Sequence, residues 1–334
     1  MTNARAHRMV CCIVGAGYSS VAGDPLTPNL LSAPVISSSH KGSLRFERVQ
    51  KDFQAWSKDN LSNNSEQYLE ELYLGKRDGF ISFKAAVELI AATLSTSAAH
   101  IAGVSIRYAA RVTRPSNCRA HIDFWRTVMR KFDDLVVVTT NYDFRIEQVL
   151  RHKPMKRPPT PGFYYGGLER PQILEGTALP FTVTNQQRYV ELTGSIPLFK
   201  LHGSLNWSLE GGGMKLYQDM RPAFRHRGDA AIVPPLYSKQ IPDWLAPVWT
   251  GAALEISRCT TWIVCGYSLP WYDRSIMKLL HDSSGNASNV YLLSPHSKNS
   301  CDRWQRVAQQ AQITPLSGLP DGIDELRKAI HWER

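Results

Sequence analysis

The sequence contains no Cys-x-x-Cys pair and no long apolar run. Paired cysteines at that spacing are typical of structural zinc sites, so we expect no bound metal. No stretch approaches the roughly 20 apolar residues that a membrane-spanning helix needs, and no apolar region of signal-peptide type follows the first residues. Internal repeats and low-complexity tracts are also missing. These absences predict a globular, cytoplasmic protein that makes no membrane contact.

Acidic residues are too few to balance the basic ones. Lys and Arg number 39 against 29 Asp and Glu, which gives a formal net charge of +10. This excess favours anionic partners but does not distinguish a nucleic acid from a dinucleotide. A chain of 334 residues with 43% hydrophobic residues can bury a large core, and it suits one elaborated domain or two modest ones.

Apolar segments predict an α/β fold built on a parallel sheet. The runs at 9–14 and 135–139 show no polar alternation, as expected for strands covered on both faces. Further strand-like segments lie at 197–203, 230–235, 260–268 and 289–295. A helical segment at 272–281 separates the last two, as a right-handed βαβ unit requires. We therefore expect a Rossmann-like parallel sheet flanked by helices.

Two segments interrupt this pattern. From about 32 to 132 apolar residues recur at helical spacing, for example Phe46, Val49 and Phe53, with a possible helix cap at Ser65. This region predicts a helical insertion that forms a smaller second subdomain. A basic, Pro-rich segment from about 151 to 197 cannot form a regular helix at its start, and we expect it to be irregular.

Small and polar residues follow several of the predicted strands. The first strand leads into Gly15-x-Gly17, a spacing similar to a dinucleotide-binding fingerprint without its third glycine. The second strand leads into the Asn-Tyr-Asp sequence at 141–143. The carboxyl ends of parallel strands meet at one edge, where open α/β sheets hold their ligands. Taken alone, Asp143 could simply cap the next helix, and His202 could be a hydrogen-bonded structural residue.

Four motifs occur in a fixed order along the chain: GAGYSSVAGDP, TTNYD, LFKLHGSLNW and IVCGYSLPWYD. Together they resemble the sirtuin-like (silent information regulator-like) family, in particular its bacterial branch of NAD-degrading, antiphage defence enzymes. The resemblance extends from residue 14 to about 295. It implies a single NAD-binding domain over residues 1–334, with the helical insertion inside it.

The resemblance also implies roles for individual residues. Asn141, Asp143 and His202 would face the nicotinamide ribose. We expect Asn141 to fix the ribose and the attacking water, His202 to act as general base, and Asp143 to orient the nicotinamide amide or offset positive charge. The residues expected to bind the rest of NAD+ are Gly15, Ala16, Gly17, Ser19, Thr140, Gly266, Tyr267, Ser268 and Ser294.

Departures from the deacylase branch favour NAD+ hydrolysis. Protein deacylases of this superfamily carry two Cys-x-x-Cys pairs after the His-Gly motif, whereas this chain has no cysteine between Cys118 and Cys259. They also carry Asp-Phe-Arg where this sequence has Leu-Thr-Pro at 26–28. The expected reaction is cleavage of NAD+ to nicotinamide and ADP-ribose by an antiphage effector.

Uncontrolled loss of NAD+ would be lethal, so we expect the activity to be regulated. Control would come from homo-oligomer assembly or from a partner defence protein, such as an ATPase, an Argonaute-like protein or another sensor. Nucleic acid would be reached through that partner. The helical insertion and the basic segments are the candidate contacts.

The sequence also allows two other functions. The pocket could sense NAD or ADP-ribose without turnover, or the chain could be a nucleic-acid-contacting subunit of an immune complex. The basic clusters at 151–157 and 221–227 lack the interleaved aromatic residues typical of single-strand binding, which disfavours the second alternative. The sequence does not separate hydrolysis from formation of a cyclic product.

Elemental analysis of the purified protein should find no stoichiometric zinc, because the cysteines are scattered and unpaired. One zinc ion per chain would instead support the deacylase interpretation.

Overall fold

The computed structural model describes residues 9–21, 26, 30–31, 44–60, 64–77, 81–101, 119–150, 163–168, 172–174, 196–210, 213–217, 229–237 and 240–331. The basic clusters at 151–157 and 221–227 lie outside these residues, so their predicted role as contact surfaces stays a prediction. Among the described residues, no helix is both long and apolar enough to span a membrane.

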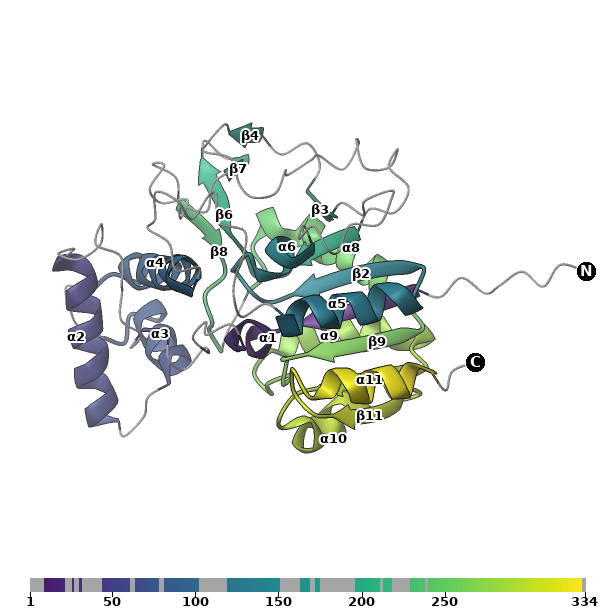
Figure 1. The fold of residues 1–334 in the computed structure, drawn as a ribbon. Coiled ribbons are helices and arrows are strands. Elements are labelled where there is room, and N and C mark those ends of the chain that lie inside the picture. The colour runs from purple at the N-terminus through teal and green to yellow at the C-terminus, as the bar shows by residue number, and fades with distance from the viewer. Residues whose placement is uncertain are drawn as a thin grey trace, which may run out of the picture.

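A seven-stranded parallel sheet runs through the molecule in the order β11-β10-β9-β1-β2-β5-β3 (Figure 1). Its strands are β1 (Met9–Val14), β2 (Asp134–Thr139), β3 (Phe163–Tyr165), β5 (Ile196–Lys200), β9 (Thr261–Cys265), β10 (Asn289–Leu293) and β11 (Gln312–Leu316). From β1 the chain builds outward first through β2 and β5, and then on the other side through β9, β10 and β11. This is the doubly wound order of Rossmann-like folds, and it confirms the predicted fold class.

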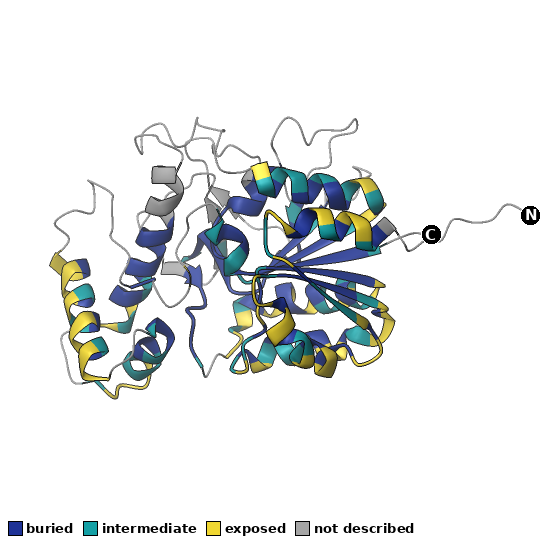
Figure 2. Cartoon of the chain, turned by 60° about the horizontal axis from the view of Figure 1, so that its bottom comes forward, coloured by how far each residue is buried: buried dark blue, intermediate teal, exposed yellow. Residues whose placement is uncertain are grey.

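Helices cover both faces of the sheet (Figures 1 and 2). One face carries α5 (Arg119–Lys131), α6 (Arg145–Leu150) and α11 (Gly322–His331), and the other carries α8 (Ala246–Ser257), α9 (Arg274–Asp282) and α10 (Ser297–Val307). Every residue of β9, and every residue of β1 after Met9, is buried. Burial from two sides explains why these strands are continuously apolar.

Six of the seven strands, all except β3, end in one row across the sheet, with Leu316 of β11 paired with Leu293 of β10. Val14 pairs with both Thr139 and Cys265, Thr139 pairs with Lys200, and Cys265 pairs with Leu293. The loops that follow these strands therefore leave the sheet side by side at its carboxyl edge. All the predicted site residues lie in those loops, in the short helix α1 (Ala16–Ser20) after β1, or at a turn that follows β5.

A group of three helices lies beside the sheet: α2 (Leu44–Asp59), α3 (Ser65–Tyr73) and α4 (Phe83–Ile101) (Figure 1). The ring of Phe53 packs against those of Trp56 and Tyr68, with ring centroids 5.9 and 5.2 Å apart. The cap of α3 is Asn64, one residue before the predicted Ser65, and its side chain accepts a hydrogen bond from the Glu66 N–H.

Helix α5 falls within the predicted insertion range but packs on the sheet. Arg327 of α11 donates a hydrogen bond to Thr127 of α5 at 3.0 Å, and Trp125 of α5 donates one to the hydroxyl of Tyr18 at 2.8 Å. Among the described residues, the helices that stand apart from the sheet are therefore α2, α3 and α4 alone.

A second, four-stranded sheet in the order β4-β7-β6-β8 begins at the end of β5. Its strands are β4 (Gln172–Leu174), β6 (Gly203–Glu210), β7 (Gly213–Tyr217) and β8 (Asp229–Ile232). Only Leu201 and His202 separate β5 from β6. Gly203 has a φ of +81°, and a Cβ atom there would lie 2.0 Å from the carbonyl oxygen of Ala231. Glycine is needed at this position, and the chain passes from one sheet to the other at His202.

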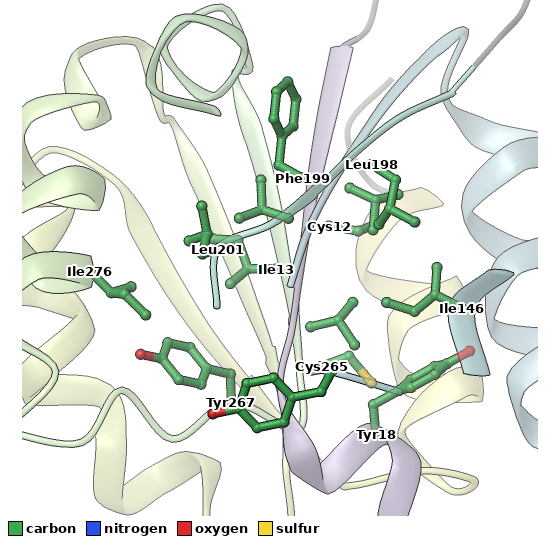
Figure 3. Packing of buried hydrophobic residues seen from close by; sticks show 14 of the residues in the cluster. Cys12, Ile13, Tyr18, Ile146, Leu198, Phe199, Leu201, Cys265, Tyr267 and Ile276 are labelled. Atoms are coloured by element: carbon green, nitrogen blue, oxygen red, sulfur yellow. The ribbon is translucent and has the colours of Figure 1, made fainter. Parts of the chain in front are cut away.

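Two of the strand-end loops touch backbone to backbone. The Gly15 N–H donates to the carbonyl of Cys265 at 3.0 Å, and the Gly17 N–H donates to that of Gly266 at 2.9 Å. Gly266 has a φ of +65°, and an added Cβ atom would lie 2.1 Å from the backbone nitrogen of Tyr18. Figure 3 shows Tyr18 and Tyr267 near Cys265, where these loops leave the sheet.

Replacing Gly266 with Ala should lower the free energy of unfolding by about 2–4 kcal/mol, because it adds both backbone strain and a steric overlap. Gly285→Ala is the matched control, since a Cβ atom there would meet nothing within 4 Å. That change should alter stability by less than about 0.5 kcal/mol. Urea denaturation measures both values, and equal stabilities would contradict the loop packing described above.

Candidate functional site

A cavity of about 470 Å³ opens at the carboxyl edge of the parallel sheet. The structure brings together in its lining all the predicted site residues except Gly15. These are Ala16, Gly17, Ser19, Thr140, Asn141, Asp143, His202, Gly266, Tyr267, Ser268 and Ser294. The cavity lies where the strand order reverses between β1 and β9, which is the position at which doubly wound sheets bind ligands.

Gly15 does not line the cavity but supports its wall. An added Cβ atom would lie 2.7 Å from the carbonyl oxygen of Gly266. Its own carbonyl accepts a hydrogen bond from the Asn141 side chain at 3.0 Å. The close packing of the two loops therefore explains this glycine, and the expected contact between Gly15 and a ligand stays a prediction.

The side chain of Asn141 is held in one orientation. Its Nδ2 atom donates to the carbonyl of Gly15 and to the hydroxyl of Ser19, both at 3.0 Å, while its backbone N–H donates to Thr139 Oγ1 at 3.0 Å. In the described part of the chain, no group donates a hydrogen bond to Asn141 Oδ1. A buried amide whose nitrogen is fixed and whose oxygen has no protein donor is suited to accept a hydrogen bond from a ligand.

Asp143 caps the helix that follows it. Its Oδ1 atom accepts the backbone N–H of Arg145 at 2.9 Å, at the start of α6. The capping role foreseen for this residue is thus present. Asp143 also lines the cavity, so capping by one carboxylate oxygen and contact with a ligand are compatible.

His202 lies between two cavities. It is buried, and its carbonyl accepts the backbone N–H of Val233 at 2.8 Å. Besides the cavity at the sheet edge, it lines a second one of about 410 Å³, whose walls include Trp249 and Arg274. Tyr272 and Asp273 also line both cavities. The imidazole is therefore placed where two separate molecules could reach it.

A buried ion pair connects two of the site loops. Lys200 Nζ lies 2.8 Å from Glu147 Oε1, and the two side chains are 1% and 0% exposed. The same ammonium group donates to the carbonyls of Tyr142 and Asp143. Burial raises the pKa of the Glu147 carboxyl group, and the adjacent Lys200 limits this rise. Since Lys200 is two residues before His202, this ion pair holds the 141–143 loop in place beside the imidazole.

The helical group contributes one residue to the cavity that sequence reasoning missed. Glu66 of α3 is buried and lines the cavity, as does Tyr272. Burial, followed by the influence of the Glu66 carboxylate, raises the pKa of Tyr272 far above its ordinary value. The neighbouring Asp273 accepts the hydroxyl of Tyr267 at 2.8 Å. No local pattern signals Glu66, because only the docking of α3 brings it to the strand-end loops.

The acidic residues Glu66, Asp143 and Asp273 give the cavity its formal charge. Neither Lys nor Arg occurs among the described residues that line it, and the buried Arg145 and Lys200 are not lining residues. Within the described ranges, no group of three or more His, Cys, Asp or Glu side chains is arranged to hold a metal ion.

No family model matches this chain, and no curated protein matches it. Solved structures that are similar include a Sir2 homolog–NAD complex, at 11% identity and a TM-score of 0.47 over 98% of this chain and 91% of that one. A triple mutant of a Sir2 homologue with 2′-O-acetyl ADP ribose has 13% identity and a TM-score of 0.47 over 98% and 93%. A point mutant of a Sir2 homologue with ADP ribose has 13% identity and a TM-score of 0.43 over 98% of this chain and 93% of that one. Similarity at this level establishes no function for the chain.

Lys200→Met should lower the free energy of unfolding by about 3–5 kcal/mol, because it leaves Glu147 buried without its cation. The double change Lys200→Met with Glu147→Gln should recover part of this loss, since no unpaired charge remains. Chemical denaturation of the two variants measures the difference.

Arg258→Met serves as a control for that series, because its ion pair with Glu255 lies at the surface and should contribute less than about 1 kcal/mol. A double variant no more stable than the single Lys200→Met protein would show that burial of an unpaired charge is not the cause.

Proposed function

We propose that this chain binds NAD+ in the cavity at the sheet edge and hydrolyses it to nicotinamide and ADP-ribose. The observation that carries the proposal is the meeting of Asn141, Asp143 and His202 in the same cavity as the loops after β1 and β9. The resemblance of the four sequence motifs to the sirtuin-like family supports it, because those motifs supply most of the lining. A volume of about 470 Å³ is also within the usual range for small-molecule binding pockets.

The cavity offers different chemistry at its two ends. The hydroxyl groups of Ser19, Ser268 and Ser294 can donate hydrogen bonds to the diphosphate and the adenosine half. Asn141 Oδ1 can accept a hydrogen bond from a hydroxyl of the nicotinamide ribose. His202 and the carboxylates at the other end then face the bond that breaks.

In the proposed reaction the bond between ribose C1′ and the nicotinamide nitrogen breaks, and its electron pair leaves with the ring as neutral nicotinamide. The positive charge that develops on the ribose is stabilised by the fixed oxygen atoms of Asn141 and Asp143. Water adds to C1′ and gives up one proton to His202 as general base. The sum is NAD+ and water giving ADP-ribose, nicotinamide and a proton.

The second cavity supports water as the acceptor, because His202 also lines it and it is large enough to hold several water molecules. The same cavity favours one alternative, transfer of the ADP-ribosyl group to an acceptor other than water. Product analysis separates the two reactions, since only hydrolysis releases free ADP-ribose in equal amount to nicotinamide.

The proposed biological role is that of an antiphage effector whose activity depends on homo-oligomer assembly or on a partner protein. This part of the proposal is supported by the motif resemblance and by the need to restrain NAD+ loss. Assays of the isolated chain and of the chain with candidate partners test it.

His202→Ala should lower the rate of nicotinamide release by about 10²- to 10⁴-fold, the usual contribution of a general base. Chromatographic analysis of nicotinamide and ADP-ribose measures this rate under conditions in which the parent chain is active. His281→Ala is the matched control, because His281 is exposed on α9 and pairs with Asp282. Undiminished turnover by His202→Ala, or loss of its folded structure, would contradict the proposed role.

A further inference from the structure

Helix α3 is anchored at two points to Tyr237, which lines the second cavity. Asn64 Nδ2 donates to the hydroxyl of Tyr237 at 2.6 Å, and Glu70 Oε2 accepts the backbone N–H of Tyr237 at 3.1 Å. Residues four apart share one face of a helix, so Glu66 faces the same way as Glu70. The two anchors therefore direct Glu66 into the cavity at the sheet edge, where it is only 7% exposed.

The position of Glu66 within the cavity follows from where its helix is anchored. Tyr237, to which α3 is bound, lines the second cavity, and its ring lies 5.0 Å from that of Tyr272, which lines both cavities together with Asp273 and His202. Glu66 thus lies at the end where the two cavities meet. In the proposed function this is the end that holds the nicotinamide ring and its ribose.

Charge at this end is formally negative. One oxygen of Asp143 caps α6, and one oxygen of Asp273 accepts the hydroxyl of Tyr267, whereas Glu66 is the carboxylate that the helical group adds. A partly buried carboxylate attracts a nearby cation more strongly than an exposed one does, because less water screens it. It offers no such attraction to a neutral ring.

We propose that Glu66 is a specificity-determining residue that makes the cavity prefer NAD+ over NADH. The inference rests on the proposed function. The oxidised nicotinamide ring carries a positive charge and the reduced ring is neutral, while the rest of the two molecules is identical. The ratio of their affinities therefore reports the electrostatic environment of the ring, and α3 supplies part of that environment from outside the sheet.

The test is calorimetric titration of the full chain with NAD+ and with NADH, in a His202→Ala background that prevents turnover. Glu66→Gln should weaken NAD+ binding by about 5- to 30-fold and leave NADH binding unchanged. Glu66→Asp, which keeps the charge, should retain most of the preference. Glu47→Gln is the matched control, because it removes an exposed charge from α2 outside the cavity lining, and the ratio of NAD+ to NADH affinity should not change.

Each other outcome decides against the inference. An affinity ratio that stays constant in Glu66→Gln would overturn it while leaving NAD binding established. Equal weakening of NAD+ and NADH would show that Glu66 only supports the fold. Failure of the parent chain to bind either dinucleotide would overturn both the inference and the proposed function.

Discussion

The parallel register of the central sheet is the constraint on which the site depends. Val14, Thr139, Lys200, Cys265 and Leu293 end in one row, so the loops that follow them meet at one edge. A slip of one residue in a strand would turn its buried side chains to the opposite face. Such a slip would also move the loop that follows the strand relative to the neighbouring loops. The register that packs the core is thus the register that assembles the cavity.

Bonds between the loops then fix the cavity wall. The Gly17 N–H donates to Gly266, the Asn141 amide joins Gly15 to Ser19, and Lys200 joins Glu147 to the 142–143 carbonyls. Asn141, Glu147 and Lys200 are buried, and in such surroundings hydrogen bonds are little screened and an unpaired group is costly. The polar atoms left facing the cavity are therefore held in place before any ligand arrives. Such preorganisation is what stabilisation of a developing charge requires.

Sequence reasoning found what is encoded locally. Continuous apolar runs located β1, β2, β9 and β10, and the polar residues directly after them line the cavity. It missed β3 and β4, which lie in the segment expected to be irregular, and it missed β7. It also missed β11, an edge strand that contains Pro315 and is mostly only partly buried. It also missed Glu66 and Lys200, whose positions depend on which helix docks on which loop and on a cation buried within an apolar strand. It grouped α5 with the insertion, because helical spacing does not show which surface a helix covers.

The central claim is that the strand-end cavity holds NAD+ with its nicotinamide ribose beside Asn141 and His202. A crystal structure with a non-cleavable carbocyclic analogue of NAD+ tests it most directly. We expect the diphosphate near Ser19 and Ser268, and the nicotinamide ring at the end where Glu66 and Tyr272 lie. Density for the analogue in the reversed direction, in the second cavity only, or nowhere on the chain would contradict it.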